Sequence, residues 1–404
     1  MVKHFKRNLV CLYVIKVSGW LMLYMPVVKL FYEENGLGDY DLFILHAIYS
    51  LIIALLEIPS GYFADRMGRK ISLLLGALFG FFGFGTYSLF HGFSGFIMAE
   101  ILLGIGQSFI SGSDSAMLYD TLLDSGKAKK YMKYEGRISA AGNFAEASAG
   151  LVIFLLIFSG MSTYRIPYYL QTFVALMAIP AALLLTEPGR HKNLVPVKLA
   201  RLFDIVKYAL FENKPLRNHI IFSSIIGFST LTMAWFAQIY FYRVHLNESL
   251  FPVFWTLLNL TVGIGSVRAY RIEKYLGMKK TVLLVLLFIS SGFFLNAIFL
   301  SIPAILLLFV FYFVRGIATP VLKDYINRLT TSDIRATVLS VRSLIIRILF
   351  SAIGPLLGWM SDNISLRMAL LMCGFTVLLT GGITIAAILR SIKQTPLLHT
   401  PGNE

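Results

Sequence analysis

The sequence predicts an all-α integral membrane protein with twelve transmembrane helices in two six-helix bundles. Three observations predict this fold class. Of the 404 residues, 57% are hydrophobic and only 14% are charged, whereas soluble globular domains carry about 25% charged residues. The chain contains twelve apolar runs, each long enough to cross a hydrocarbon core of about 30 Å as a helix. One long polar gap, at 186–217, separates six runs from the other six.

The twelve predicted spans follow one another along the chain. They lie at about 9–31, 41–62, 71–90, 94–119, 137–159, 164–185, 218–242, 250–267, 280–300, 302–322, 336–360 and 367–389. Strands are excluded as spans because the runs are too long and lack the alternation of a barrel strand. The first run exceeds the apolar region of a signal peptide, and no small-x-small cleavage site follows it. We therefore expect it to remain as the first helix.

The composition excludes a soluble enzyme, a disordered chain and a disulfide scaffold. The two cysteines, Cys11 and Cys373, lie in apolar runs and indicate neither a disulfide nor a metal site. On a soluble domain the net charge of +15 would suggest a nucleic-acid partner. Here the charges fall between apolar runs, so we expect a lipid bilayer around the chain and no nucleic acid.

The distribution of lysine and arginine predicts the orientation, because these residues are retained on the cytoplasmic side. With a cytoplasmic N-terminus, 28 of the 36 basic residues lie in cytoplasmic segments, and only Arg165, Arg243 and Arg367 lie in outer loops. Both termini are then cytoplasmic. We expect an N-terminal bundle at 1–187, a cytoplasmic linker at 188–216, a C-terminal bundle at 217–392 and a cytoplasmic tail at 393–404.

Charged residues inside the spans are the first candidates for function, since such residues are costly and usually face the bundle interior or a water-filled cavity. The third, sixth, ninth and twelfth spans carry none, which is typical of outer, lipid-facing helices. The other spans carry Lys16, Lys29, Glu57, Glu100, Asp114, Glu146, Arg315, Arg342 and Arg347. Lys29 lies near the outer end of its span, and we expect it to reach the interface as an anchor.

Four of the deeper charges are basic and indicate an anionic solute. They are Lys16, Arg315, Arg342 and Arg347. Arginine keeps its proton and offers a planar fork that matches a carboxylate or phosphate. The alternative is that Glu146 and Glu57 pair with two of these groups and leave the cavity nearly neutral. Trp235 and Gln238 could line the path, although such residues are more often part of simple helix packing.

Glu146 is the first candidate for a proton carrier, because burial favours its protonated form and a nearby arginine favours its ionised form. Glu57, Glu100 and Asp114 are the further candidates. Glu57 and Asp114 lie towards the cytoplasmic ends of their spans, where we expect a gating or structural role. Structural ion pairs are the alternative for the whole group.

A motif after the second span has the most specific spacing in the chain. Residues 61–70 read Gly-Tyr-Phe-Ala-Asp-Arg-Met-Gly-Arg-Lys. This stretch resembles the signature G-x-x-x-D-[R/K]-x-G-[R/K]-[R/K] of the major facilitator superfamily, and every fixed position matches. Gly61 and Gly68 permit a tight turn and a close helix approach. Asp65 can complement the positive N-terminal end of a neighbouring helix.

The resemblance implies a gate. In the family this cluster locks the cytoplasmic ends of the two halves together in the outward-facing state. By resemblance, Asp65, Arg69 and Asp120 form this latch against the start of the eleventh span near Arg335; the remaining motif residues are Gly61, Arg66, Gly68 and Lys70. The alternative is a turn with topogenic charge. Two further stretches, 111–120 and 335–340, resemble a bacterial subgroup associated with drug-like and siderophore-type solutes.

From the resemblance we expect a secondary transporter, not an enzyme, that works as a monomer in the bacterial inner membrane by alternating access. The chain shows no ATP-binding motif, so a proton gradient is the expected energy source, and no cofactor or metal is expected. A small organic anion such as a carboxylate siderophore is the expected solute. The alternatives are a multidrug efflux proton antiporter and a transporter-like sensor.

Two departures count against a drug antiporter. Many drug antiporters carry an arginine in the fourth span, where this chain has Glu100, and they carry G-P-x-x-G-G in the fifth span. Here the fifth span reads Glu-Ala-Ser-Ala-Gly at 146–150, and a G-P-x-x-G element appears in the eleventh span instead.

Overall fold

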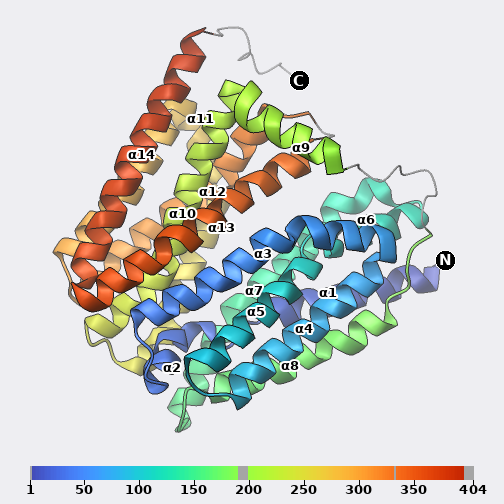
Figure 1. Ribbon diagram of the computed structural model, residues 1–404, viewed down its shortest axis with the longest axis horizontal. Helices are drawn as coiled ribbons and strands as arrows, with labels where there is room; N and C mark the ends of the chain where they lie inside the picture. Colours follow the sequence, from blue (N-terminus) through green and yellow to red (C-terminus); the bar gives the residue numbers. More distant parts are fainter. Residues whose placement is uncertain (1, 190–198, 332–333, 395–404) are drawn as a thin grey trace. The chain divides into compact units, whose positions relative to one another are not determined.

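The computed structural model describes residues 2–189, 199–331 and 334–394 (Figure 1). Every regular element within these ranges is a helix. Eleven helical segments are long and apolar enough to cross a membrane, and the segment Glu248–Ile298 contains both the eighth and the ninth predicted span. The prediction of twelve helical spans is therefore confirmed.

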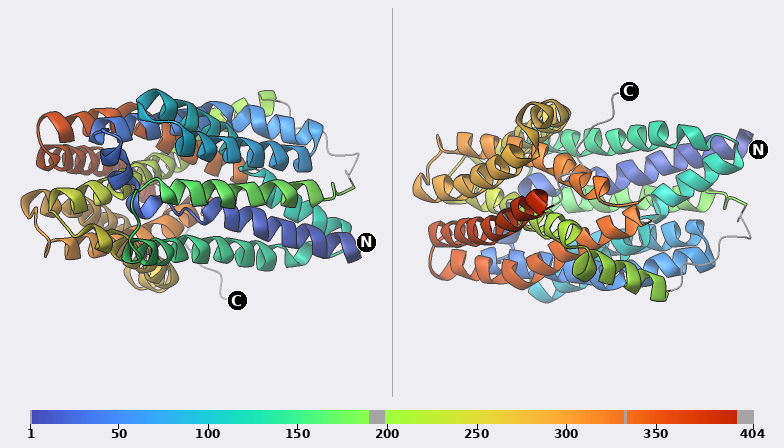
Figure 2. Two further views of the ribbon diagram at one scale, coloured as in Figure 1. Left: turned by 90° about the horizontal axis from the view of Figure 1, so that it is seen from below. Right: turned by 90° about the horizontal axis from the view of Figure 1, so that it is seen from above.

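The first of two compact units contains the described residues up to 189 together with 245–257. Its helices are α1 (Val2–Trp20), η1 (Met25–Val27), α2 (Val28–Glu34), α3 (Asp39–Met67), α4 (Arg69–Leu89), α5 (Gly92–Ile110), α6 (Ser113–Asp124), η2 (Ala128–Lys130), α7 (Tyr131–Phe158), α8 (Ile166–Leu184) and η4 (Glu248–Leu250). The helix α4 contacts α5 and α8, and α3 contacts α5. Figure 2 shows α1 between α8 and α7, in agreement with its contacts to both.

The second unit contains the described residues of 197–244 and those from 258 onward. Its helices are α9 (Leu199–Lys207), the π-helical turn η3 (Tyr208–Glu212), α10 (Lys214–Arg243), most of α11 (Phe251–Ile298), α12 (Ile305–Arg328), α13 (Arg335–Asn363) and α14 (Leu366–Gln394). The helix α10 contacts α12, α13 and α14. Its most apolar window is 78% buried, the highest share of any span, so α10 is the central helix of this unit.

Two predicted spans, the first and the fourth, are interrupted in the structure. The first span is interrupted after Trp20, and the short helix η1 that follows carries Pro26, which has no amide hydrogen to donate, in its first turn. The fourth span is divided into α5 and α6 by Gly112, whose φ of +77° is left-handed. The element α11 contains two helices, those of the eighth and ninth spans, which meet at a kink where Gly277 has a non-helical φ of +71°. Hydropathy reports how long an apolar run is, and it does not report whether the helix within it is continuous.

Close helix contacts in the first unit depend on glycine. A Cβ atom added to Gly76 on α4 would lie 2.9 Å from the backbone oxygen of Gly106 on α5. One turn further along α4, a Cβ atom on Gly80 would meet open space. Small residues let membrane helices approach closely, and Gly76 and Gly106 are the pair that does so here.

Candidate functional site

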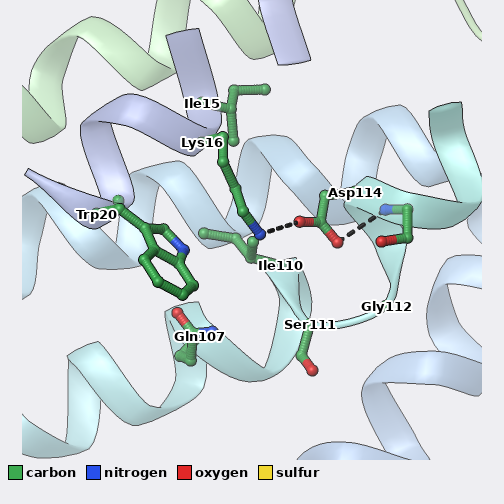
Figure 3. A pocket seen from close by; sticks show the side chains of 10 residues that line it. Ile15, Lys16, Trp20, Gln107, Ile110, Ser111, Gly112 and Asp114 are labelled. Atoms are coloured by element: carbon green, nitrogen blue, oxygen red, sulfur yellow. Dashed lines mark hydrogen bonds and ion pairs between the residues drawn. The ribbon is translucent and has the colours of Figure 1, made fainter. Parts of the chain in front are cut away.

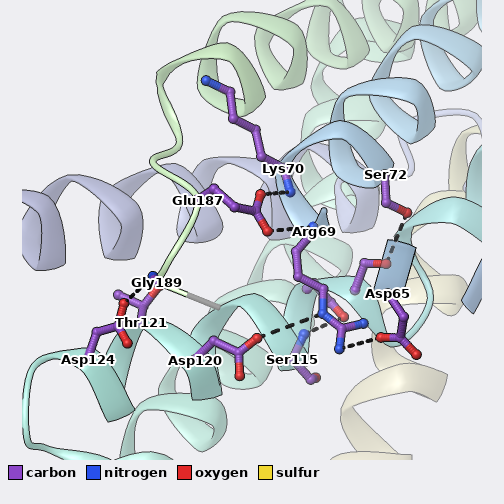
Figure 4. Close-up of polar contacts among 12 residues, drawn as sticks. Asp65, Arg69, Lys70, Ser72, Ser115, Asp120, Thr121, Asp124, Glu187 and Gly189 are labelled. Atoms are coloured by element: carbon purple, nitrogen blue, oxygen red, sulfur yellow. Dashed lines mark hydrogen bonds and ion pairs between the residues drawn. The ribbon is translucent and has the colours of Figure 1, made fainter. Parts of the chain in front are cut away.

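The motif residues lie at the junction of α3 and α4 (Figure 4). The chain turns at Gly68, whose φ is +111°. The Arg69 guanidinium lies 2.7 Å from the Asp65 carboxylate and 3.8 Å from the Asp120 carboxylate on α6. These three charges therefore lie together within the first unit. Arg66 is exposed, and the Lys70 side chain is half-buried.

A carboxylate outside the motif completes this junction. Both oxygens of Glu187, which follows α8, accept hydrogen bonds of 2.8 Å from the backbone amides of Arg69 and Lys70 (Figure 4). An anion at a helix N-terminus is favourable because the amides there lack partners within the helix. A Cβ atom on Gly68 would lie 3.0 Å from this carboxylate, so Gly68 is required both for its backbone angle and for space. The motif spacing gave no signal for Glu187.

Two expectations from the motif concern Gly61 on α3 and Arg335 on α13. A Cβ atom on Gly61 would meet nothing within 4 Å, and the close helix approach expected at Gly61 stays a prediction. Arg335 begins α13 in the second unit and donates a hydrogen bond of 3.5 Å to the backbone oxygen of Thr330. The latch between the halves stays a prediction.

A pocket of about 250 Å³ lies in the first unit, between α1, α5 and the break before α6 (Figure 3). The Lys16 ammonium lies 3.2 Å from the Asp114 carboxylate and 5.1 Å from the centre of the Trp20 ring. Gln107 and Ser111 also line the pocket. The charge of Lys16 is therefore balanced by Asp114, a pairing that the sequence analysis did not identify.

The part of the first unit around α2 buries a second cluster of charges. Lys29 on α2 is fully buried and forms ion pairs with Glu33 and Asp39. The expectation that Lys29 reaches the interface as an anchor is therefore wrong. A lysine can snorkel only when its stem points to the surface, and the short helix α2 turns this side chain inward.

Glu100 on α5 is also buried, with 3% of its surface exposed. Its carboxylate accepts a hydrogen bond of 2.6 Å from the Tyr87 hydroxyl and lies 3.2 Å from His46 Nδ1. Sequence reasoning missed both partners, because a histidine and a tyrosine in apolar helices carry no spacing signal. Glu57 on α3 and Glu146 on α7 are half-buried, and their roles as proton carriers stay predictions.

In the second unit, Arg342 on α13 is 7% exposed. Its Nε donates a hydrogen bond of 2.5 Å to the Ser223 hydroxyl on α10, and Nη2 lies 3.5 Å from the Ser223 backbone oxygen. Arg315 on α12 stacks 5.4 Å from the centre of the Tyr312 ring, and Arg347 on α13 is half-buried. Among the residues that the structure describes, no ion pair includes Arg315, Arg342 or Arg347.

Two further candidates lie on α10. Gln238 is fully buried, and neither atom of its amide has a hydrogen-bond partner within the described ranges. Trp235, one turn earlier, is 9% exposed. An unpaired buried amide is costly, so the position favours a polar group that Gln238 can bind.

The acidic residues inside the spans all lie in the first unit, where the in-span bases Lys16 and Lys29 both form ion pairs. Glu57, Glu100, Asp114 and Glu146 all belong to the first unit, and the three deep arginines belong to the second. The acids Glu273 and Asp362 of the second unit pair with arginines, Arg328 and Arg243 respectively. The first unit thus supplies groups that can hold a proton, and the second supplies groups that can hold an anion.

The sequence comparisons agree on a family. The family described as Major Facilitator Superfamily matches residues 10–355. The quinolone resistance protein NorA of Staphylococcus aureus (strain MRSA252) is 19% identical over 211 residues, which is 52% of this chain and 53% of NorA. The match thus spans about half the length of the curated relatives.

Solved structures agree on the fold. The nucleoside transporter NupG is 13% identical with a TM-score of 0.76, over 95% of this chain and 98% of that one. A D-xylose–proton symporter is 15% identical with a TM-score of 0.74, over 95% of this chain and 96% of that one. At these identities the likeness shows the arrangement of helices.

Proposed function

The chain belongs to the Major Facilitator Superfamily, and from this premise we propose that it moves a small organic anion across the bacterial inner membrane, driven by a proton gradient. It is a multi-pass secondary transporter and not an enzyme. Alternating access of the two halves is the proposed mechanism. A carboxylate siderophore is one solute of the proposed class.

The surroundings of Arg342 are the observation that supports an anionic solute. Its guanidinium is buried, and its hydrogen bonds go to the neutral Ser223. A buried charge without a counter-ion is costly, because water is lost and no opposite charge replaces it. A carboxylate or phosphate on the solute would supply that charge through two parallel hydrogen bonds. The buried amide of Gln238 offers an additional donor and acceptor for the polar part of a solute.

A multidrug efflux proton antiporter is the second candidate, and the match to NorA favours it. The pocket at Lys16 contains an acid and an aromatic ring, Asp114 and Trp20, and a cationic drug would have to replace the Lys16 ammonium that contacts both. Such a pair suits a cationic, apolar drug. The buried Arg342 and the half-buried Arg315 and Arg347 of the second unit do not suit that class, because they would repel a cation.

Transport into proteoliposomes separates the two candidates. The assay compares a panel of radiolabelled mono-, di- and tricarboxylates with ethidium in the presence of a pH gradient. Arg342→Ala is expected to raise the KM for the transported carboxylate by about 10- to 100-fold, because a hydrogen bond to a charged group contributes about 1.5–3 kcal/mol. Arg342→Lys is expected to recover part of the affinity, since it restores the charge without the fork.

The matched control is Arg328→Ala, which removes an exposed arginine paired with Asp324 on α12 and is expected to leave the KM unchanged. Ethidium transport that is lost in Asp114→Asn and retained in Arg342→Ala, with no carboxylate moved, would contradict the anion proposal. That result would instead identify the antiporter.

A further inference from the structure

Four helices of the first unit meet at the carboxyl group of Glu100 on α5. Tyr87 donates to this carboxylate from α4 at 2.6 Å, and His46 Nδ1 approaches it from α3 at 3.2 Å. The Tyr87 hydroxyl also hydrogen-bonds the Tyr32 hydroxyl of α2 at 2.9 Å. His46, Tyr32 and Tyr87 are as deeply buried as Glu100 itself. We call these four residues the Glu100 network.

Aromatic rings enclose the network. The Tyr87 ring lies 4.9 Å from that of Phe96 and 5.0 Å from that of Tyr168, and Phe31 stacks on Phe96 at 5.2 Å. This shell separates Glu100 from water, so the carboxylate has exchanged its hydration for the hydrogen bond from Tyr87 and the close contact with His46. A group in such surroundings is sensitive to any change in its charge.

Other ionisable groups surround Glu100 on the neighbouring helices. Tyr24 before η1, Tyr32 on α2, His46 on α3, Tyr87 on α4 and Tyr168 on α8 interact with Glu100 directly. Asp41 and Tyr49 on α3, Glu146 on α7 and Arg165 before α8 interact with these tyrosines. Arg165 is occupied by backbone oxygens of 87, 88 and 90 and by Asn35. Lys29 is occupied by Glu33 and Asp39. In the described part of the chain, His46 is the one basic side chain within ion-pair distance of Glu100.

A histidine and a carboxylate in contact titrate as one unit. With one proton between them the pair has no net charge, whether the proton is on Nδ1 of His46 or on the Glu100 carboxyl. A second proton makes the pair positive, and the loss of the first makes it negative. Imidazole and carboxyl groups can both bind a proton, so the contact places two such groups side by side in one buried site.

We propose that the Glu100–His46 pair, held in place by Tyr87 and Tyr32, is the site that binds the coupling proton. That this proton drives transport rests on the proposed function. Binding adds one proton to a ring nitrogen or a carboxylate oxygen, and release returns it to water. Glu146 is half-buried on α7 and is the competing candidate. The charges of Glu100 and Glu146 both act on the Tyr24 hydroxyl, so the two carboxyls lie within electrostatic range of one residue.

Infrared difference spectroscopy tests the site without any solute. The full-length protein is placed in lipid nanodiscs and titrated between about pH 8 and pH 5, where a histidine–carboxylate pair changes its proton content. Carboxyl and imidazole bands are recorded together. The parent is expected to show a buried titrating component that disappears in both Glu100→Gln and His46→Gln, because the two groups act as a unit. Tyr87→Phe is expected to shift its midpoint by about one pH unit.

The matched control is Glu34→Gln, which removes an exposed carboxyl from α2 and is expected to leave the component in place. Tyr87→Phe removes only one hydroxyl group. The shift in its titration midpoint therefore tests the site even if the Glu100→Gln variant does not fold. A titration unchanged in Glu100→Gln and His46→Gln overturns the proposal, as does a component lost only in Glu146→Gln. Since no solute is added, failure of the anion assignment leaves this result unaffected.

Discussion

Single side chains show how charge is accommodated inside this protein. Lys16 and Lys29 both lie in apolar runs, and both are neutralised, by Asp114 and by Asp39 with Glu33. Arg342 instead binds a serine. A buried ion pair costs less than an isolated buried charge, because each partner replaces part of the lost hydration of the other. The residues without such a partner are the ones we assign to the solute.

Glu187 carries a prediction at this scale. Its carboxylate binds the first two amides of α4, so Glu187→Ala is expected to lower the free energy of unfolding by about 1 kcal/mol, the usual contribution of an N-terminal cap. Denaturant unfolding of the purified protein measures the change. Glu212→Ala, which removes an exposed carboxylate paired with Lys207, is the control and should cost less, because exposed ion pairs contribute little. Equal losses in the two variants would contradict the capping role.

At the scale of elements, breaks in the helices position the candidate site. The pocket at Lys16 lies where α5 ends and α6 begins, and Ser111 and Gly112 of this break line it. Interrupted helices expose backbone groups that continuous helices satisfy internally, and in membranes such breaks are tolerated where they line a cavity or are buried in protein. The break before α2 likewise turns Lys29 inward.

The contact between α4 and α5 gives a prediction at this scale. Gly76→Ala is expected to destabilise the protein by about 1–3 kcal/mol, the range for overpacking, because the new Cβ atom would lie 2.9 Å from the Gly106 backbone oxygen. Gly80→Ala, one turn away on α4, meets open space and should be neutral or stabilising, since alanine favours a helix. Thermal unfolding in detergent compares the two variants. If Gly76→Ala stabilised the protein, the prediction would be contradicted, because α4 and α5 could then move apart without loss of stability.

At the scale of the whole molecule, the motif charges bear on the equilibrium between conformations. Arg69 joins Asp65 on α3 to Asp120 on α6, and the family resemblance implies that this cluster holds the cytoplasmic ends of the two halves together. A ligand or a substitution shifts such an equilibrium only by the difference in its interaction with the two states. Removing one motif charge should therefore change populations and leave the fold intact.

Asp65→Asn is expected to depopulate the outward-facing state. Spin labels at Ser162, between α7 and α8, and at Ser301, between α11 and α12, both exposed, report the distance between two loops that we expect on the outer side. The distance distribution of Asp65→Asn should shift towards shorter values than in the parent. Asp124→Asn is the control, because Asp124 accepts a hydrogen bond from the Gly189 amide and has no ion pair with Arg69. Identical distributions in Asp65→Asn and the parent would refute the latch.

The sequence by itself determined the membrane class, the twelve spans and the family, because hydropathy and motif spacing are local properties that can be counted along the chain. It also identified Glu100 and Arg342 as unusual charges. Only the tertiary structure decided their partners, His46 and Ser223, which lie 54 and 119 positions away. Ion pairs and hydrogen bonds depend on distances of a few ångströms between helices, and those distances arise only when the helices pack together.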